Sequence, residues 1–123
     1  MTNMATVDFF AIGNALIDQE FRVSDDFLNQ QNLQKGTMQL TDGDTQATLY
    51  QLLQANQQYK GQASGGSAAN TTVAFSALGG SAFYACRVGN DDLGTLYLDG
   101  LNEAKIQTTE KSISEGVTGT CMV

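Results

Sequence analysis

A glycine pair near the middle of this sequence could help to bind a small molecule that carries hydroxyl groups. The pair, Gly65 and Gly66, is followed by Ser67 and Asn70 in a run that predicts a helix. Glycine lets backbone amides approach a ligand closely, and the first amides of a helix lack an intrahelical partner. An asparagine one turn into the helix can donate to and accept from a hydroxyl. By spacing alone, a glycine turn with Ser67 as helix N-cap is the simpler interpretation.

A second polar segment follows an apolar run at residues 7–12, which predicts a buried strand. It contains Asn14 and Asp18, and open α/β sheets bind ligands at the ends of their strands. A carboxylate can accept hydrogen bonds from two neighbouring hydroxyls, and such a site discriminates against molecules that lack them. A turn residue that satisfies the local backbone is the competing interpretation.

Several other kinds of site are excluded by motif and composition. The first strand is followed by Gly13 and Asn14 rather than by the G-x-G-x-x-G fingerprint of dinucleotide sites, and no G-x-x-x-x-G-K-[ST] phosphate loop occurs. The chain contains no histidine, which removes the commonest metal ligand and general base. We therefore expect no metal site and no catalytic triad in this chain.

The charge and hydropathy of the chain restrict its partners. Its 123 residues carry a formal net charge of −7, with 41% hydrophobic and 15% charged residues, which is a globular composition. An acidic chain repels nucleic acid and anionic membrane surfaces. No apolar stretch approaches the roughly 20 residues of a membrane span, and the N-terminus lacks a secretory pattern. We expect a cytoplasmic protein whose Cys86 and Cys121 are reduced, without nucleic-acid or membrane partners.

Strand and helix patterns alternate along most of the sequence, which predicts an α/β fold with helices on the faces of a sheet. Residues 59–63 are too polar to assign, and the strands expected at 20–23 and 37–40 suggest a small β excursion. The other expected strands cover residues 7–12, 82–88, 106–108 and 117–123. The expected helices cover residues 25–32, 42–56, 68–78 and 93–104.

In this order, the motifs resemble the ribokinase-like sugar and nucleoside kinases of the PfkB family. The resemblance runs over essentially the whole chain, and residues 118–121 with Asn14 and Asp18 are most similar to adenosine-kinase-type members. It implies a ribokinase-like sandwich with helices around a mainly parallel sheet, and a small β lid built from residues 20–23 and 37–40. The matching segments are residues 13–18, 35–40, 65–70, 79–80 and 89–94.

The resemblance also implies roles for single positions in binding a nucleoside or sugar. The positions that match residues holding vicinal hydroxyls are Asp18, Gly66 and Asn70. The positions that match residues beside the ring or base are Asn14, Gly65 and Ser67. Leu16 and Cys121 match positions in the pocket wall.

The family's later motifs, N-x-x-E and G-A-G-D, do not occur in this chain. The resemblance therefore implies that residues 1–123 are the substrate-binding, N-terminal part of an ATP- and magnesium-dependent kinase that phosphorylates a hydroxymethyl group. The catalytic base and the ATP-binding half are expected to be absent, so that the fragment alone is inactive. The end of the chain inside an apolar strand led to the same expectation of a longer protein. A non-catalytic binding module, dimerising through the lid or an exposed sheet, is the alternative.

Overall fold

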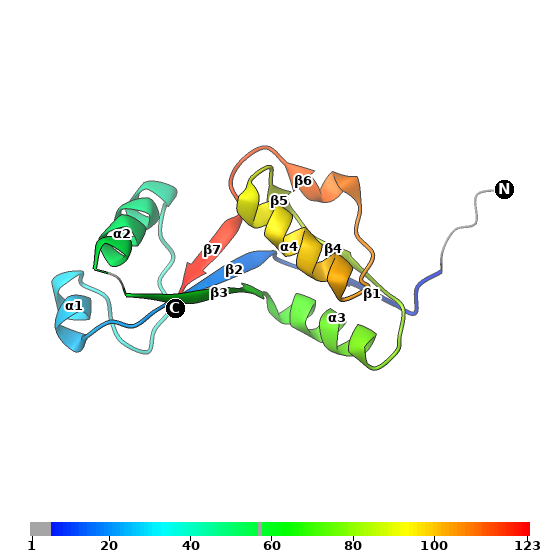
Figure 1. Cartoon of the computed structure of the whole chain (residues 1–123), viewed down its shortest axis with the longest axis horizontal. Helices are drawn as coiled ribbons and strands as arrows, with labels where there is room; N and C mark the ends of the chain where they lie inside the picture. Colours follow the sequence, from blue (N-terminus) through cyan, green and yellow to red (C-terminus); the bar gives the residue numbers. More distant parts are fainter. Residues whose placement is uncertain (1–5, 57) are drawn as a thin grey trace. The chain divides into compact units, whose positions relative to one another are not determined.

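The computed structural model describes residues 6–56 and 58–123 and contains short strands alternating with helices (Figure 1). Residues 1–5, on which part of the expected lack of a secretory signal rests, lie outside the described residues. In chain order the elements are β1 (Phe9–Ile12), β2 (Leu16–Phe21), α1 (Asp25–Gln30), α2 (Gly43–Ala55), β3 (Tyr59–Gly65), α3 (Ser67–Ala77), β4 (Ala82–Ala85), β5 (Val88–Gly89), α4 (Asp92–Glu103), η1 (Glu110–Ser112), β6 (Ile113–Ser114) and β7 (Gly119–Met122).

The predicted α/β class is confirmed, including its parallel component. β1 pairs with β4 in parallel, with Phe9 opposite Ala82, and β5 pairs in parallel with β6. A further sheet has the strand order β3-β2-β7. Parallel pairing requires a long crossover between the paired strands, and α3 lies within the crossover from β1 to β4.

The described chain forms two compact units. The first unit comprises the residues up to Asp18 together with Ala63–Cys121. The second comprises Gln19–Gln62 and Met122–Val123.

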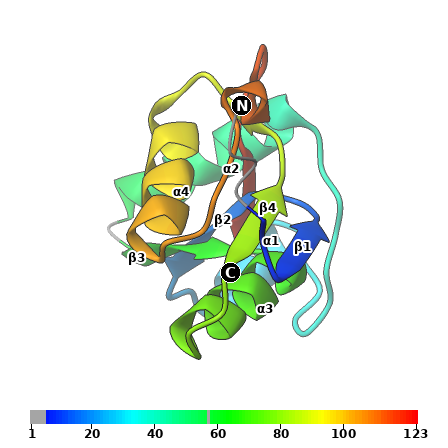
Figure 2. The same cartoon turned by 90° about the vertical axis from the view of Figure 1, so that its right-hand side faces the viewer.

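The first unit is built on the β1–β4 pair, with α3 against one face of it (Figure 2). Side chains alternate along β1, so Phe9 faces α3 and lies 5.0 Å from the ring of Phe75. Phe10 points the other way and stacks on Phe83 at 5.4 Å, where it is 62% exposed. The buried core of this unit consists of Ala15, Ile17, Ala69, Tyr84, Val88, Tyr97, Leu101 and Ile106.

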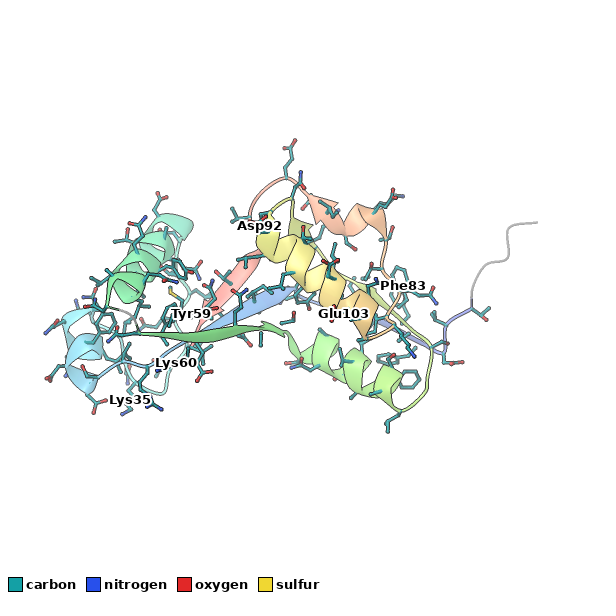
Figure 3. The ribbon with its side chains drawn as sticks, viewed as in Figure 1. Lys35, Tyr59, Lys60, Phe83, Asp92 and Glu103 are labelled. Carbon is teal, nitrogen blue, oxygen red and sulfur yellow. The ribbon has the colours of Figure 1, made fainter. Side chains whose placement is uncertain are left out.

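Helix α4 is amphipathic, as the spacing of its apolar residues predicts. Tyr97 and Leu101 are buried on one side, whereas Asp92 and Glu103 are exposed near the two ends of the helix (Figure 3). The helix begins after Asp91, whose carboxylate accepts a hydrogen bond from the Gly94 amide at 2.8 Å. This N-cap fixes the start of the helix.

The second unit has a small core around Phe21, which is 8% exposed. The rings of Tyr50 and Tyr59 contact Phe21 edge-on, at 5.9 and 5.6 Å. Helix α2 starts after Asp42, whose side chain accepts from the Thr45 amide at 2.8 Å. Within the described residues, none of the helices combines the length and hydropathy that a membrane crossing demands.

Two predictions for the β excursion are corrected by the structure. The strand expected at residues 37–40 is absent, and Met38 and Leu40 are 83% and 94% exposed. An isolated extended segment gains no stability without a strand beside it, so its alternating pattern alone does not form β structure. The strand expected at residues 20–23 ends at Phe21 and belongs to the longer strand β2.

Candidate acceptor-binding site

All six predicted site residues lie in the first unit, on two segments that the structure brings together. We call residues 13–18 and 65–70 the site segments. The first follows β1 and continues into β2, so that Asp18 lies within a strand rather than in a turn. The second connects β3 to α3, and Gly65 is the last residue of its strand.

At Gly65 the site segments meet through the carboxylate of Asp18. A Cβ atom on Gly65 would lie 2.5 Å from Asp18 Oδ2 and 3.0 Å from Oδ1, too close for any real side chain. Glycine is therefore required for the carboxylate to pack against this backbone. This contact brings Asp18 and the glycine pair together.

At Gly66 the site segments meet a second time, through the backbone. Gly66 has φ 104°, a conformation that residues with a side chain rarely adopt, and its missing Cβ would lie 2.6 Å from the Asn14 carbonyl oxygen. The two contacts place Asn14 and Asp18 on one side of the glycine pair. The structure thereby joins residues that are about fifty positions apart in the chain.

Helix α3 begins one residue earlier than predicted, and Gly66 rather than Ser67 is its N-cap. Because Gly66 has no side chain, no cap hydrogen bond satisfies the first amides of the helix. Such amides favour a negatively polarised partner, such as a hydroxyl oxygen. Ser67 and Asn70 are both exposed, one turn apart along this helix.

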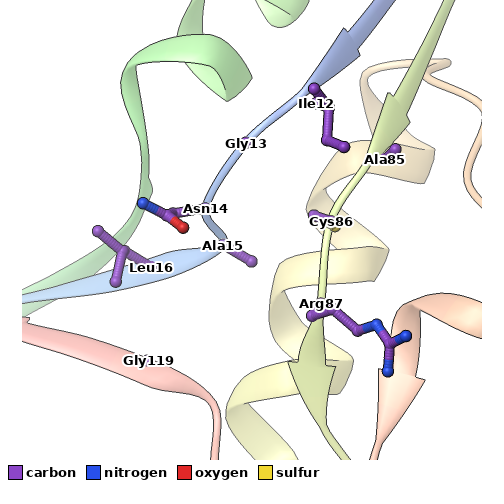
Figure 4. Close-up of a pocket in the computed structure, with 9 residues that line it drawn as sticks. All are labelled: Ile12, Gly13, Asn14, Ala15, Leu16, Ala85, Cys86, Arg87 and Gly119. Carbon is purple, nitrogen blue, oxygen red and sulfur yellow. The ribbon is translucent and has the colours of Figure 1, made fainter.

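A cavity of about 470 Å³ lies beside the first site segment, at the carboxyl ends of β1 and β4 (Figure 4). Asn14, Leu16 and Gly119 line it, whereas Cys121 does not. Cys86 also lines the cavity, and burial raises the pKa of its thiol. The Arg87 side chain is directed away from Asn14. The cavity is thus bordered mainly by apolar groups, together with the Asn14 amide and Arg87.

A second, smaller cavity of about 220 Å³ borders the other site segment. Gly65 and Asn70 line it together with Tyr97 of α4. Of the predicted residues, Asn14 thus lines the larger cavity, and Gly65 and Asn70 line the smaller one. Asp18, Gly66 and Ser67 line neither cavity.

The start of α4 is tied to β7 by a network that the sequence analysis did not find. The Thr118 hydroxyl and amide donate to the Asp91 carboxylate at 2.6 and 2.8 Å, and the Gly89 amide donates to the Thr118 hydroxyl at 3.0 Å. These hydrogen bonds, led by that of the Thr118 hydroxyl, hold the pKa of Asp91 below its ordinary value. The network positions Gly119, which lines the larger cavity.

The cysteines are unbridged, as expected. In the part of the chain that the structure describes, no group of three or more His, Cys, Asp and Glu side chains is arranged to hold a metal ion.

The comparisons with known proteins define the family of this α/β chain. Residues 37–123 match the pfkB family carbohydrate kinases. The chain belongs to the PfkB family, as its motifs predicted. Comparison with curated proteins gave no match.

Solved structures similar to this chain include adenosine kinases and a sugar kinase. Adenosine kinase from Sinorhizobium meliloti is 32% identical, with a TM-score of 0.78 over 96% of this chain and 35% of that chain. A probable sugar kinase from Rhizobium etli CFN 42 is 28% identical, with a TM-score of 0.78 over 97% and 35%. Adenosine kinase from Schistosoma mansoni, in complex with 2-fluoroadenosine, shares the fold at 22% identity and a TM-score of 0.79, over 94% and 34%. The chain spans about a third of the length of these structures.

Proposed function

We propose that this chain is the acceptor-binding part of a kinase that phosphorylates a hydroxymethyl group of a nucleoside or a sugar. The observation that carries the proposal is the packing of the Asp18 carboxylate against the backbone of Gly65, beside the uncapped start of α3. A carboxylate accepts hydrogen bonds from hydroxyls, and free helix amides donate them. Two vicinal hydroxyls can donate to the carboxylate and accept from the amides at the same time, so they suit this carboxylate and these amides.

In this proposal Asp18 and Asn70 hold the vicinal hydroxyls, together with the amides at Gly66 and Ser67. Asn14 and Leu16 border the ring or base in the larger cavity. Phosphoryl transfer depends mainly on positioning and on neutralising charge, and a fixed acceptor supplies the first of these. The residues of this chain are proposed to orient the acceptor, and none is proposed as a catalytic base.

Magnesium-ATP would supply the transferred phosphoryl group and neutralise its charge. The described residues offer no cluster of three metal-binding side chains, so they do not fit a magnesium site of that kind. We therefore assign only acceptor binding to this chain and propose that the fragment alone transfers no phosphate. The family membership and the adenosine and sugar kinases among its structural relatives support the kinase class.

Calorimetric titration of the 123-residue chain with adenosine, 2′-deoxyadenosine and ribose tests the binding part of this proposal. We expect adenosine or ribose to bind, and 2′-deoxyadenosine to bind more weakly than adenosine. The variant D18N keeps the shape but removes the charge, and it should weaken binding by about tenfold or more, the usual cost of losing charged hydrogen bonds. The variant D26N, at an exposed acid in α1, serves as the matched control.

Transfer of phosphate from ATP by the protein expressed from its complete gene tests the kinase part. A panel of nucleosides and sugars should include an acceptor that is phosphorylated on its hydroxymethyl group. Binding by the chain without transfer to any member of the panel would instead support the non-catalytic binding module.

A further inference from the structure

Two buried tyrosines lie directly beneath the site segments, and neither belongs to the predicted set of binding residues. Tyr84 is on β4 and Tyr97 is on α4, and both side chains are 0% exposed. The Tyr84 hydroxyl donates to the Asn14 carbonyl at 2.9 Å. The Tyr97 hydroxyl donates to the Gly65 carbonyl at 3.0 Å. Each site segment thus rests on one tyrosine hydroxyl.

The two hydroxyls lie against glycines of the site segments. A Cβ atom on Gly13 would lie 2.7 Å from the Tyr84 hydroxyl, and one on Gly66 would lie 3.7 Å from the Tyr97 hydroxyl. Glycine at position 13 therefore leaves room for a phenol that reaches the backbone from below. The tyrosines touch the parts of the chain where Asn14 meets Gly66 and where Gly65 meets Asp18.

Both hydroxyls stay protonated, and therefore able to donate, over the physiological range. Burial is the main cause that raises the pKa of Tyr84 and of Tyr97 above the ordinary value. The two hydroxyls also interact with each other. We therefore expect a movement of one phenol to shift the other, and through it the opposite site segment.

Buried tyrosines generally find some carbonyl partner, so a purely structural role is the simplest competing explanation. Two features go beyond it. Both acceptors are backbone carbonyls of proposed binding residues, Asn14 and Gly65. The two tyrosines also come from different elements, β4 and α4, and meet at one place.

We propose that Tyr84 and Tyr97 are positioning residues that set the separation of the two site segments and thereby the selectivity for an acceptor with vicinal hydroxyls. They act through Asn14, Gly65 and the Asp18 carboxylate packed on Gly65. The selectivity part of this inference rests on the proposed function, whereas the effect on the backbone does not.

The effect on the backbone is tested without ligand, by amide hydrogen exchange and carbonyl chemical shifts of the full chain. The variant Y97F should shift the Gly65 carbonyl resonance and lower the exchange protection of residues 65–70 by about tenfold, the usual effect of one lost hydrogen bond. The variant Y84F should do the same at residues 13–18, and each should also disturb the opposite segment. The control is Y50F, which alters an α2 tyrosine that accepts from Gln54.

Unchanged shifts and protection at both site segments in Y84F and Y97F would overturn the inference. Changes confined to the segment next to each substitution would overturn the coupling between the tyrosines. These outcomes are read whether or not any nucleoside binds.

Selectivity is tested by titrating the same variants with adenosine and 2′-deoxyadenosine. Y97F should lower the ratio of the affinity for adenosine to that for 2′-deoxyadenosine by about three- to tenfold. The reason is that the Tyr97 hydroxyl no longer fixes Gly65, against which the Asp18 carboxylate packs. A destabilising core substitution that lines neither cavity, I106A, should lower the melting temperature without changing that ratio. An unchanged ratio in both tyrosine variants would overturn the selectivity role, whereas absence of nucleoside binding in the unmodified chain would count against the proposed function instead.

Discussion

At Gly65 and Gly66 of the candidate site, only glycine leaves space for the atoms that approach the backbone. The contacts concern the Asp18 carboxylate at Gly65 and the Asn14 carbonyl at Gly66. Gly61 lies in the same strand as Gly65, but nothing lies within 4 Å of the position where its Cβ would be. The two glycines of this strand therefore differ in what a methyl group would displace.

We predict that G65A lowers the free energy of unfolding by about 1–3 kcal/mol, the usual cost of overpacking. It should also weaken adenosine binding, because the Asp18 carboxylate must move. Urea denaturation and calorimetry measure the two effects. The matched variant G61A should change neither by more than a few tenths of a kcal/mol, and equal effects of both substitutions would contradict the close contact at Gly65.

Burial of Tyr97 predicts a loss of stability in alkaline solution. Its pKa in the folded chain lies above the ordinary value of about 10, so the unfolded chain loses this proton first as the pH rises. The contribution of Tyr97 to the free energy of unfolding is fully present below about pH 10 and declines above it, by at most about 1.4 kcal/mol per pH unit. Denaturant titrations between about pH 9 and 11, one unit either side of the ordinary tyrosine pKa, measure this loss. The free energy of unfolding should decline less steeply with pH for Y97F than for the unmodified chain. Parallel curves for the two proteins would refute this.

Between elements, the connection from Asp91 to Thr118 fixes β7 to the start of α4. The carboxylate caps the helix and also accepts two hydrogen bonds from Thr118. One acid thus orders both a helix start and the residue before the strand that carries Gly119. A substitution at Thr118 should therefore alter the position of Gly119 in the lining of the larger cavity.

We predict that T118V, which keeps the shape and removes the hydroxyl, lowers the free energy of unfolding at pH 7 by about 1–3 kcal/mol. The pKa of Asp91 is depressed in the folded chain, so its contribution is present above the ordinary value of about 4 and is lost as the pH falls below it. The difference between wild type and T118V should therefore shrink in acid. T48V, at an exposed threonine of α2, is the control for thermal unfolding across pH.

The element predictions succeeded where one segment carries its own signal. Asp42 and Asp91 cap their helices as short polar residues before an apolar stripe should, and the apolar run of β1 forms a strand. The element predictions failed where pairing with a neighbouring strand decides whether a segment becomes a strand. The polar sequence of β3 forms a strand because β2 lies beside it, whereas residues 37–40 have a strand-like pattern and remain irregular.

In the first unit as a whole, one face of the β1–β4 pair is exposed and apolar. Phe10 and Ile12 are 62% and 76% exposed on it, and Phe10 stacks on Phe83. Among the described residues β1 pairs only with β4, so its other edge also has no strand partner. An unpaired strand edge beside an apolar face promotes association.

We predict concentration-dependent self-association of the chain, which sedimentation velocity measures. Replacing both exposed residues, in the variant F10T/I12T, should shift the distribution toward monomer. Leu78 is also exposed, at 89%, but it lies at the end of α3 rather than on this face, so L78T should leave association unchanged. A concentration-independent monomer of the unmodified chain would refute the prediction.

The sequence by itself determined the family, the α/β class and the identity of the six candidate residues. It did so because the glycine pair, Asp18 and the caps express local requirements of shape and charge that few other residues meet. Neither Tyr84 nor Tyr97 was among the predicted binding residues.

Only the tertiary structure decided how the candidates meet. The contact of Asp18 with Gly65, the tyrosines beneath both segments and the Thr118–Asp91 network join residues 27 or more positions apart. Such contacts depend on the register of strands and the packing of helices, which no local pattern encodes. The glycine pair was therefore predictable as a candidate, whereas its partners became visible only in the folded chain.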